Sequence, residues 1–490
     1  MKNLKKVLTL FLSAMMCVSV AACGGANNGD SDNSEDLAGR RLLNFEFLQA
    51  GYGIEGYKAM AEAFMKENPD VLVKLKPNYE INTTTSTKLE SNNNVSDLYL
   101  VTNEQDIRRW AIKGWVEEIP DVYAAEVKEG VTLADAMTAS AKEVGAYNGK
   151  YYSVAEYVSV NGFVYNKTLF NKYGWTIPNT TAELEALCDK IISDTDGEVA
   201  PFVYCGAEAG GYLQFAAENW LIQYEGMENL DNFYKFDDPE LFNADNSYGK
   251  KYALENLKKF FYDNEAEYCM KKCMGKTADT AQTEFLLGKA AMMMNGSWFE
   301  TEMKEVLQEA NESGANIQLG MFKIPAITDA AGNVMRADGY VAQKDANGND
   351  MEYANGEMGA HYFIPTGAAN KEDAKAFLKF INRVDICELY TQYTNAVRPI
   401  DYNKDPSSAA YSGLSSFCKD VLTIANTNYM YSPHTQSPLA LTGVISLWAK
   451  GENWYYKMEE NPVTYTPDYC IQQDYKWVKD NWDGWMKDMN

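Results

Sequence analysis

Hydrophobic positions alternate between strand-like and helix-like periods from residue 41 onward. Residues 41–48 form a mostly apolar run, residues 57–68 carry apolar side chains at helical spacing, and residues 71–75 are mostly apolar. Pro69 separates the second run from the third. This order, followed by another strand-like run at 95–101, predicts a βαβ unit in a parallel sheet with helices on its faces.

The same alternation continues through most of the chain. Helical patterns cover 107–115, 134–144, 180–193, 211–224, 247–262, 277–287, 300–311, 371–382 and 387–394, whereas 152–165, 290–294 and 361–365 read as extended. Residues 335–358 are rich in Gly, Asn and Asp, which predicts hairpins. A chain of 490 residues exceeds the size at which one hydrophobic core stops growing, so we expect two lobes.

The amino terminus has the pattern of an export signal. Three lysines precede an apolar run at 7–20, which is shorter than the roughly 20 residues a membrane-spanning helix needs. Cys23 follows two alanines and resembles a bacterial lipobox, which implies cleavage before Cys23 and a lipid on its sulfur. A plain secretory signal and an anchor helix are the alternatives. Residues 24–39 are polar and rich in Gly, Asn and Asp, which predicts a flexible tether.

Composition excludes several classes of function. Acidic residues number 69 against 44 basic ones, and this net charge of −25 repels phosphate backbones, so we expect no nucleic acid partner. The nine cysteines are irregularly spaced and do not define a disulfide framework. The two histidines lie in no zinc or Ser-His-Asp motif. We therefore expect neither a metal nor a cofactor.

Three glycine-containing motifs have weaker interpretations. Gly51-x-Gly53-x-x-Gly56 matches the dinucleotide fingerprint, but a lone match is weak, and bare backbone N–H groups at a helix start can hold ligand oxygens instead. Residues 275–277 end like a P-loop, but the first glycine of that motif is missing. Residues 345–356 lack the Gly and Glu that a calcium loop requires, so we interpret them as a polar hairpin.

Three segments together resemble the family 1 extracellular solute-binding proteins, the sugar-binding components of ABC importers. The first is Gly149-Lys150-Tyr151-Tyr152 with the Tyr-Asn-Lys-x-x-Phe pattern at 165–170, the second is 288–298, which ends in Gly-Ser-Trp, and the third is 364–381. The three segments match the family pattern in order and spacing, and the match covers about residues 40 to 425. The family's Pro-x-Asp is replaced by Ala-Glu-Tyr at 155–157, which leaves the identity of the sugar open.

The resemblance implies an α/β, two-lobed fold of the periplasmic-binding-protein type (type II). Each lobe is then a mainly parallel sheet flanked by helices, and hinge strands join the lobes. After a signal peptide at 1–22 and a lipidated cysteine with its tether at 23–39, lobe 1 would comprise 40–155 plus 365–425. Lobe 2 would comprise 156–364 plus 426–490. Ligand would bind between the lobes and close them.

A sugar stacks its C–H faces on aromatic rings and bonds its hydroxyls to planar donors and acceptors. Trp298 matches the family tryptophan that often stacks on the sugar. The residues we expect at the ligand are Trp298, Asp97, Tyr52, Tyr157, Glu156, Tyr340, Phe215 and Asn219. Packing is the alternative for Trp298, helix capping for Asp97 and a hairpin core for Tyr340.

The expected function is that of an extracytoplasmic solute-binding protein, anchored to the bacterial cell membrane through Cys23. It would bind a carbohydrate, an oligosaccharide, and deliver it to the permease subunits of an ABC importer. We expect a monomer without catalytic activity. Ligand sensing or binding of a non-sugar solute by the same fold is the main alternative, and a surface glycan-degrading enzyme is a more distant one.

Overall fold

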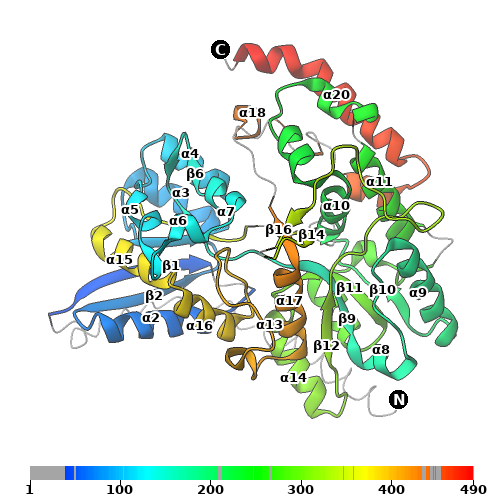
Figure 1. Ribbon diagram of the computed structural model, residues 1–490, viewed down its shortest axis with the longest axis horizontal. Coiled ribbons are helices and arrows are strands. Elements are labelled where there is room, and N and C mark those ends of the chain that lie inside the picture. The colour runs from blue at the N-terminus through cyan, green and yellow to red at the C-terminus, as the bar shows by residue number, and fades with distance from the viewer. Residues whose placement is uncertain are drawn as a thin grey trace, which may run out of the picture.

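The computed structural model consists of two α/β lobes that lie side by side (Figure 1). It describes residues 39–488 except 49–50, 103, 208–211, 247, 264–266, 346, 357, 433–436, 442–444, 446 and 449–453. The predicted lipidation site Cys23 and nearly all of the predicted tether lie outside the described residues. Within them, no helix is both long and apolar enough to cross a membrane.

Lobe 1 is built on a five-stranded sheet with the order β2-β1-β3-β15-β8. Its strands are β1 (Arg41–Leu48), β2 (Val71–Asn78), β3 (Leu98–Val101), β8 (Val154–Ala155) and β15 (His361–Phe363). The predicted βαβ unit is confirmed, because β1 pairs in parallel with β2 and the helix α2 (Glu55–Glu67) connects them. β15 runs antiparallel to both β3 and β8 and is the one reversed strand of this sheet.

Lobe 2 is built on a four-stranded sheet with the order β10-β11-β9-β12. Its strands are β9 (Asn161–Asn166), β10 (Ala200–Phe202), β11 (Ala290–Gly296) and β12 (Leu319–Phe322). β10 and β11 are parallel, whereas β9 is antiparallel to both β11 and β12. Each lobe therefore has a mainly parallel sheet with one reversed strand.

The reversed strands are those by which the chain enters a lobe. β9 follows the crossing from lobe 1 at 156–160, and β15 follows the return at 356–360. Other strands end at the junction of the lobes, so a strand that begins there must run the opposite way. The extended run predicted at 152–165 is accordingly two strands, β8 and β9, in different sheets.

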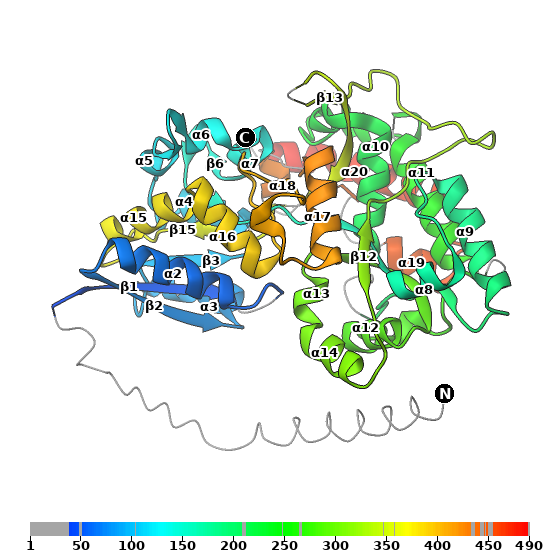
Figure 2. The same cartoon turned by 60° about the horizontal axis from the view of Figure 1, so that its bottom comes forward.

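Helices cover both sheets. Lobe 1 carries α2, α3 (Ile81–Ser91), α4 (Glu104–Ile112), α5 (Pro120–Tyr123), α6 (Leu133–Ala136), α7 (Ala139–Val144), α15 (Lys371–Ile381) and α16 (Val384–Thr394). Lobe 2 carries α8 (Lys167–Tyr173), α9 (Thr181–Asp194), α10 (Leu213–Phe233), α11 (Tyr248–Leu257), α12 (Ala278–Leu286), α13 (Phe299–Glu302), α14 (Lys304–Glu312), α17 (Ser416–Thr427), α18 (Pro438–Leu441), α19 (Trp454–Glu460) and α20 (Pro467–Asp488). Figure 2 shows α15 and α16 beside α2 over the first sheet.

Some helix predictions were wrong in extent. The helix expected at 300–311 is divided at Met303 into α13 and α14. The helix expected at 134–144 is broken into α6 and α7, because Met137 is extended and the Thr138 side chain accepts a hydrogen bond from the Ala141 N–H and so starts a new helix. The helix expected at 211–224 continues to residue 233 as α10, although Gly226 leaves helical geometry with a φ of 76°. Aromatic and apolar side chains surround this helix on several sides, so periodicity did not mark its end.

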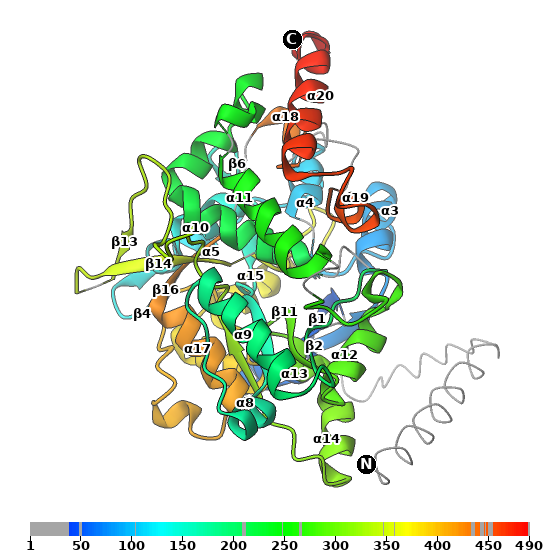
Figure 3. The ribbon, with the colours of Figure 1, turned by 90° about the vertical axis from the view of Figure 1, so that its right-hand side faces the viewer.

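Smaller strands complete the molecule. Hairpin strands β13 (Gln343–Lys344) and β14 (Asp350–Asn355) form the predicted polar hairpin, and β14 continues in parallel with β16 (Asn428–Tyr431). Short antiparallel pairs are β4 (Glu126–Lys128) with β5 (Val131–Thr132), and β6 (Ala146–Tyr147) with β7 (Lys150–Tyr151). Figure 3 shows α20 along the outside of lobe 2, with its carboxyl-terminal turns extending past the body.

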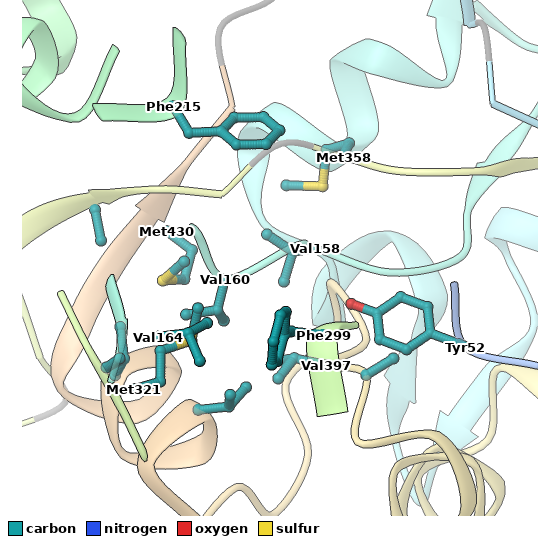
Figure 4. Packing of buried hydrophobic residues seen from close by; sticks show 14 of the residues in the cluster. Tyr52, Val158, Val160, Val164, Phe215, Phe299, Met321, Met358, Val397 and Met430 are labelled. Carbon is teal, nitrogen blue, oxygen red and sulfur yellow. The ribbon is translucent and has the colours of Figure 1, made fainter. Parts of the chain in front are cut away.

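The lobes are joined by packed, extended chain. Val158 forms isolated β-bridges with both Met358 and Val397, so three passages of the chain lie next to one another. Their side chains belong to one apolar cluster with Phe299 and Tyr52, as Figure 4 shows. β15 pairs within the sheet of lobe 1 and α17 contacts β12 of lobe 2. β15 thus joins lobe 1 before the limit expected at 364/365, and α17 packs on lobe 2 before the limit expected at 425/426. The lobe limits themselves stay predictions.

Candidate ligand-binding site

A cavity of about 270 Å³ lies at the junction of the two lobes. Lobe 1, the segments that cross between the lobes, and lobe 2 all line it. Lobe 1 contributes Leu48, Gly51, Tyr52, Tyr57, Leu100 and Thr102. The crossing segments contribute Glu156, Tyr157, Ser159, Gly359 and Ala360, and lobe 2 contributes Tyr212, Trp298 and Glu302. Leu48 ends β1, Thr102 follows β3, and Trp298 follows β11. The cavity thus lies where open α/β sheets bind ligands, at the carboxyl ends of their strands.

Trp298 is positioned by the glycine two residues before it. A Cβ at Gly296 would lie 2.1 Å from Cζ3 of the indole, so the ring can fold over the end of β11 only because residue 296 has no side chain. Tyr212 and Phe215 pack against the indole with ring centroids 5.9 and 6.0 Å away. The indole is partly exposed. The Gly-Ser-Trp motif therefore sets an aromatic ring in the cavity wall.

Ser297 links the lobes. Its hydroxyl lies 2.7 Å from the hydroxyl of Tyr52 and accepts a hydrogen bond from the backbone N–H of Val160 at 3.2 Å. The Ser297 N–H also donates to the carbonyl of Val160. Burial raises the pKa of Tyr52, so its hydroxyl stays protonated. A loop of lobe 1 is thereby hydrogen-bonded to the end of a lobe 2 strand.

Tyr52 and Tyr157 form a second aromatic wall. Their rings meet edge to face, with centroids 4.8 Å apart and planes at 73°. Tyr157 lies on the bare backbone of Gly359, where a Cβ would be only 1.9 Å from its ring. Both rings come from segments at or next to the hinge, so movement of the lobes would change this wall.

Glu156 lies behind the wall. It is fully buried and accepts hydrogen bonds from the hydroxyls of Tyr57 at 3.1 Å and Tyr362 at 2.8 Å. Burial raises the pKa of Glu156, whereas the charge of Arg398 and the tyrosine hydrogen bonds act in the opposite direction. The Arg398 guanidinium donates to Asn382 and lies over the rings of Tyr362 and Tyr390. This polar cluster holds Tyr57, which lines the cavity, in place.

The cavity residues that were missed from sequence include Glu302 and Tyr212. Glu302 is four residues beyond Trp298, a spacing that puts both side chains on one helix face and could have indicated it. Its carboxylate accepts a hydrogen bond from the Gln282 amide at 3.0 Å. Tyr212 precedes α10 with a φ of 61°, a left-handed conformation that is unusual for an aromatic residue and that sequence periodicity does not indicate.

The structure brings four predicted site residues into the cavity lining, namely Trp298, Tyr52, Tyr157 and Glu156. Phe215 lies just behind, against Trp298. The other three predicted residues do not line the cavity.

Each of those three residues has structural partners. Asp97 accepts hydrogen bonds from the backbone N–H groups of Asn44 and Asn370 and so links β1 to the start of α15. Asn219 is buried and accepts a hydrogen bond from the backbone N–H of Asn355. Tyr340 packs edge to face on Tyr353 in the hairpin region.

The cavity suits a ligand with apolar faces and a polar rim. Aromatic rings form two walls, and carboxylate, hydroxyl and backbone groups supply polar contacts. Among the described residues, no group of three or more His, Cys, Asp or Glu side chains is placed to hold a metal ion.

Two α/β lobes, joined by extended strands and sharing an aromatic cavity at the carboxyl ends of their sheets, define a two-lobed solute-binding protein of type II. Residues 50–384 match the model for the bacterial extracellular solute-binding proteins, and the chain belongs to that family. Membership of this family places the protein outside the cytoplasm.

Individual relatives agree with this assignment. The multiple sugar-binding protein of Streptococcus mutans is 22% identical over 503 residues, which cover 100% of this chain and 99% of the relative. The sugar-binding protein MalE from Xanthomonas citri has a similar fold, with a TM-score of 0.63, 14% identity and coverage of 92% of this chain and 100% of MalE. RafE in complex with raffinose has a TM-score of 0.61 at 18% identity, covering 89% of this chain and 100% of RafE.

Proposed function

We propose that the protein is the lipid-anchored receptor of an ABC importer, which binds an oligosaccharide between its lobes and passes it unchanged to the permease. The observation that carries this proposal is the aromatic cavity at the lobe junction, which lobe 2 lines with Trp298 and Tyr212, lobe 1 with Tyr52, and the crossing segment with Tyr157. The relatives named for multiple sugars and for raffinose support a glycan as the ligand.

The physical basis is the two-sided character of a sugar ring. Its C–H face packs on an indole or phenol, and its hydroxyls need acceptors and donors at the rim. Glu302 offers a carboxylate, and the Gly51 loop, with a φ of 56°, offers backbone next to Trp298. Because contacts come from both lobes, ligand stabilises the closed arrangement over the open one.

Anchoring and delivery rest on the sequence and on the family. Cys23 in its lipobox-like setting supplies the anchor, and the polar segment that follows it gives the receptor reach from the membrane surface. The relatives that the chain matches are solute-binding proteins rather than enzymes. We therefore propose that the glycan leaves the cavity chemically intact.

Calorimetry or thermal shift with the purified mature protein and a broad glycan panel tests the proposal. We expect saturable binding around micromolar, about −8 kcal/mol, to at least one oligosaccharide, with no cleavage products by mass spectrometry. A panel that produces no shift, or a glycan that is cut, would overturn it.

The Trp298→Ala variant should lose most of the affinity for that glycan, because one stacking wall is removed. Trp115→Ala is the matched control, since Trp115 is a partly buried tryptophan of lobe 1 that packs in a separate cluster and does not line the cavity. Unchanged affinity in Trp298→Ala would remove this residue from the site.

A further inference from the structure

The charges around the cavity carry a further inference about the ligand. We propose that the cavity prefers sugars with a protonated amine over neutral sugars and rejects sugars with a carboxylate. This inference rests on the proposed function and narrows its substrate class.

The cavity lining is one-sided in charge. Among the described residues that line it, the ionisable acids are Glu156 and Glu302, and none is Lys, Arg or His. The buried Arg398 lies close to Glu156 and lowers its pKa, whereas its guanidinium is occupied by Asn382 and by two tyrosine rings. A ligand in the cavity therefore meets no cationic side chain in this lining.

Glu302 is the carboxylate that is open to the ligand. Glu302 is solvent-exposed, in contrast to the fully buried Glu156. The described part of the chain gives it the Gln282 amide as a hydrogen-bond partner and no ion pair. Burial raises the pKa of Glu302, the Gln282 hydrogen bond lowers it, and the charge of Asp279, another acid, raises it further. Since the described residues supply no cation to Glu302, we expect the ligand to supply it.

Aromatic rings complete the cation-binding chemistry. The face of a Trp or Tyr ring attracts an ammonium group, and the attraction grows as water is removed. Trp298 lies one helical turn before Glu302, so one ammonium group can contact both the indole and the carboxylate. A sugar carboxylate in the same position would face Glu302 and the negative faces of the rings without a counter-charge.

A purely neutral site is the alternative. Glu302 would then accept hydrogen bonds from two sugar hydroxyls, and an amine in place of a hydroxyl would bring no gain. The cation-preferring site and the neutral site differ in how the charge of the ligand changes the affinity. They also differ in whether that change depends on Glu302.

The experiment compares sugars that share a ring but differ in charge. D-Glucose, D-glucosamine and D-glucuronate, with the corresponding galacto and manno series, are titrated into the mature protein by calorimetry in a neutral buffer of low ionic strength, where charge is least screened. In at least one series, we expect the amino sugar to bind with an affinity at least about tenfold higher than that of the uronate, and also higher than that of the neutral sugar.

Glu302→Gln should shrink that preference to about twofold, because it keeps the shape and hydrogen bonds but removes the charge. Glu305→Gln is the matched control: it removes the same charge from an exposed position on α14 that does not line the cavity, so the preference should persist.

Several results would overturn the inference. The inference would be wrong if a neutral sugar or a uronate bound as tightly as the amino sugar. It would also be wrong if the Glu302→Gln variant kept the preference for the amino sugar. If neutral oligosaccharides bind and no amino sugar does, the charge preference fails while the proposed function stands. If no glycan of either panel binds, both fail.

Discussion

Glycines determine where the aromatic rings of the cavity can lie. Gly296 gives Trp298 its place over the end of β11, and Gly359 gives Tyr157 its place at the hinge. Neither glycine has a positive φ, so the requirement is space rather than backbone freedom. A methyl group at either position would displace a ring that faces the ligand.

Gly296→Ala should weaken glycan binding by about tenfold or more and cost roughly 1–3 kcal/mol of stability, because the added Cβ overlaps the indole of Trp298. Calorimetry and urea denaturation measure the two effects. Gly413→Ala is the control, since a Cβ there meets no atom within 4 Å. Wild-type affinity in Gly296→Ala would show that the position of the indole is irrelevant to binding.

The hydrogen bond between Tyr52 and Ser297 can be measured by a double-mutant cycle. Tyr52→Phe should cost about 1 kcal/mol in unfolding free energy, and Ser297→Ala should cost more, because it also leaves the Val160 N–H without its hydroxyl partner. The double variant should cost less than the sum of the two single variants. Strict additivity would mean that the two hydroxyls do not interact.

Sequence reasoning found the cavity residues that belong to recognisable motifs. Trp298 follows a Gly-Ser pair at the end of a buried strand, and Tyr52 lies in a glycine-rich loop before a helix. Asp97 looked similar in sequence, but its carboxylate links β1 to α15 inside lobe 1. Tyr212 is placed by a left-handed backbone conformation, which residue spacing does not encode.

Among elements, α20 shows how a surface helix can be fixed by a buried charge pair. Lys250 of α11 and Asp474 of α20 have side chains only 3% and 4% exposed, with Nζ and Oδ2 3.4 Å apart. Lys250 also donates to the Leu447 carbonyl at 2.7 Å, and the Trp454 indole donates to Asp474 at 2.6 Å. The pair thus joins the carboxyl-terminal helix to the body of lobe 2.

Asp474→Leu should destabilise lobe 2 by about 3–5 kcal/mol, because it leaves the Lys250 ammonium buried without its counter-charge. The double change Lys250→Met with Asp474→Leu should recover much of this loss, since no charge remains buried. Chemical denaturation followed by circular dichroism gives both values. A double variant no more stable than the single one would show that packing, not charge, dominates here.

Local patterns predicted the elements with long or strongly periodic sequences. β1, α2 and β2 have clear periods, and Thr180 marks the start of α9 as its cap. β10 and β12 span three and four residues, which is too short for a periodic pattern to indicate them. The reversal of β9 and β15 depends on where the chain crosses between lobes, which is a property of the whole fold.

At the scale of the whole molecule, the buried His361 makes stability depend on pH. It lies on β15 with no exposed surface, and burial lowers its pKa from 6.5 to about 4. Between these values the unfolded chain takes up a proton that the folded protein does not. Stability contributed by the neutral ring is therefore fully present above pH 6.5 and falls by about 3 kcal/mol as the pH drops to about 4.

His361→Gln should flatten this part of the stability profile, because glutamine does not titrate. Unfolding free energies from urea titrations at neutral pH and near pH 4.5 give the slope for each protein. The variant can be less stable at every pH, and the comparison therefore uses the change with pH rather than the absolute value. Equal slopes in the two proteins would contradict a depressed pKa for His361.

The paired segments around Val158 have a consequence for how the receptor finds its ligand. Three neighbouring passages can bend together about one shared axis, but they resist the twisting that a single flexible linker would permit. If the lobes open and close as the proposed function requires, the paired segments would keep the two binding faces in register. The lobes then lose little orientational freedom when a ligand binds, so more of the contact energy is retained as affinity.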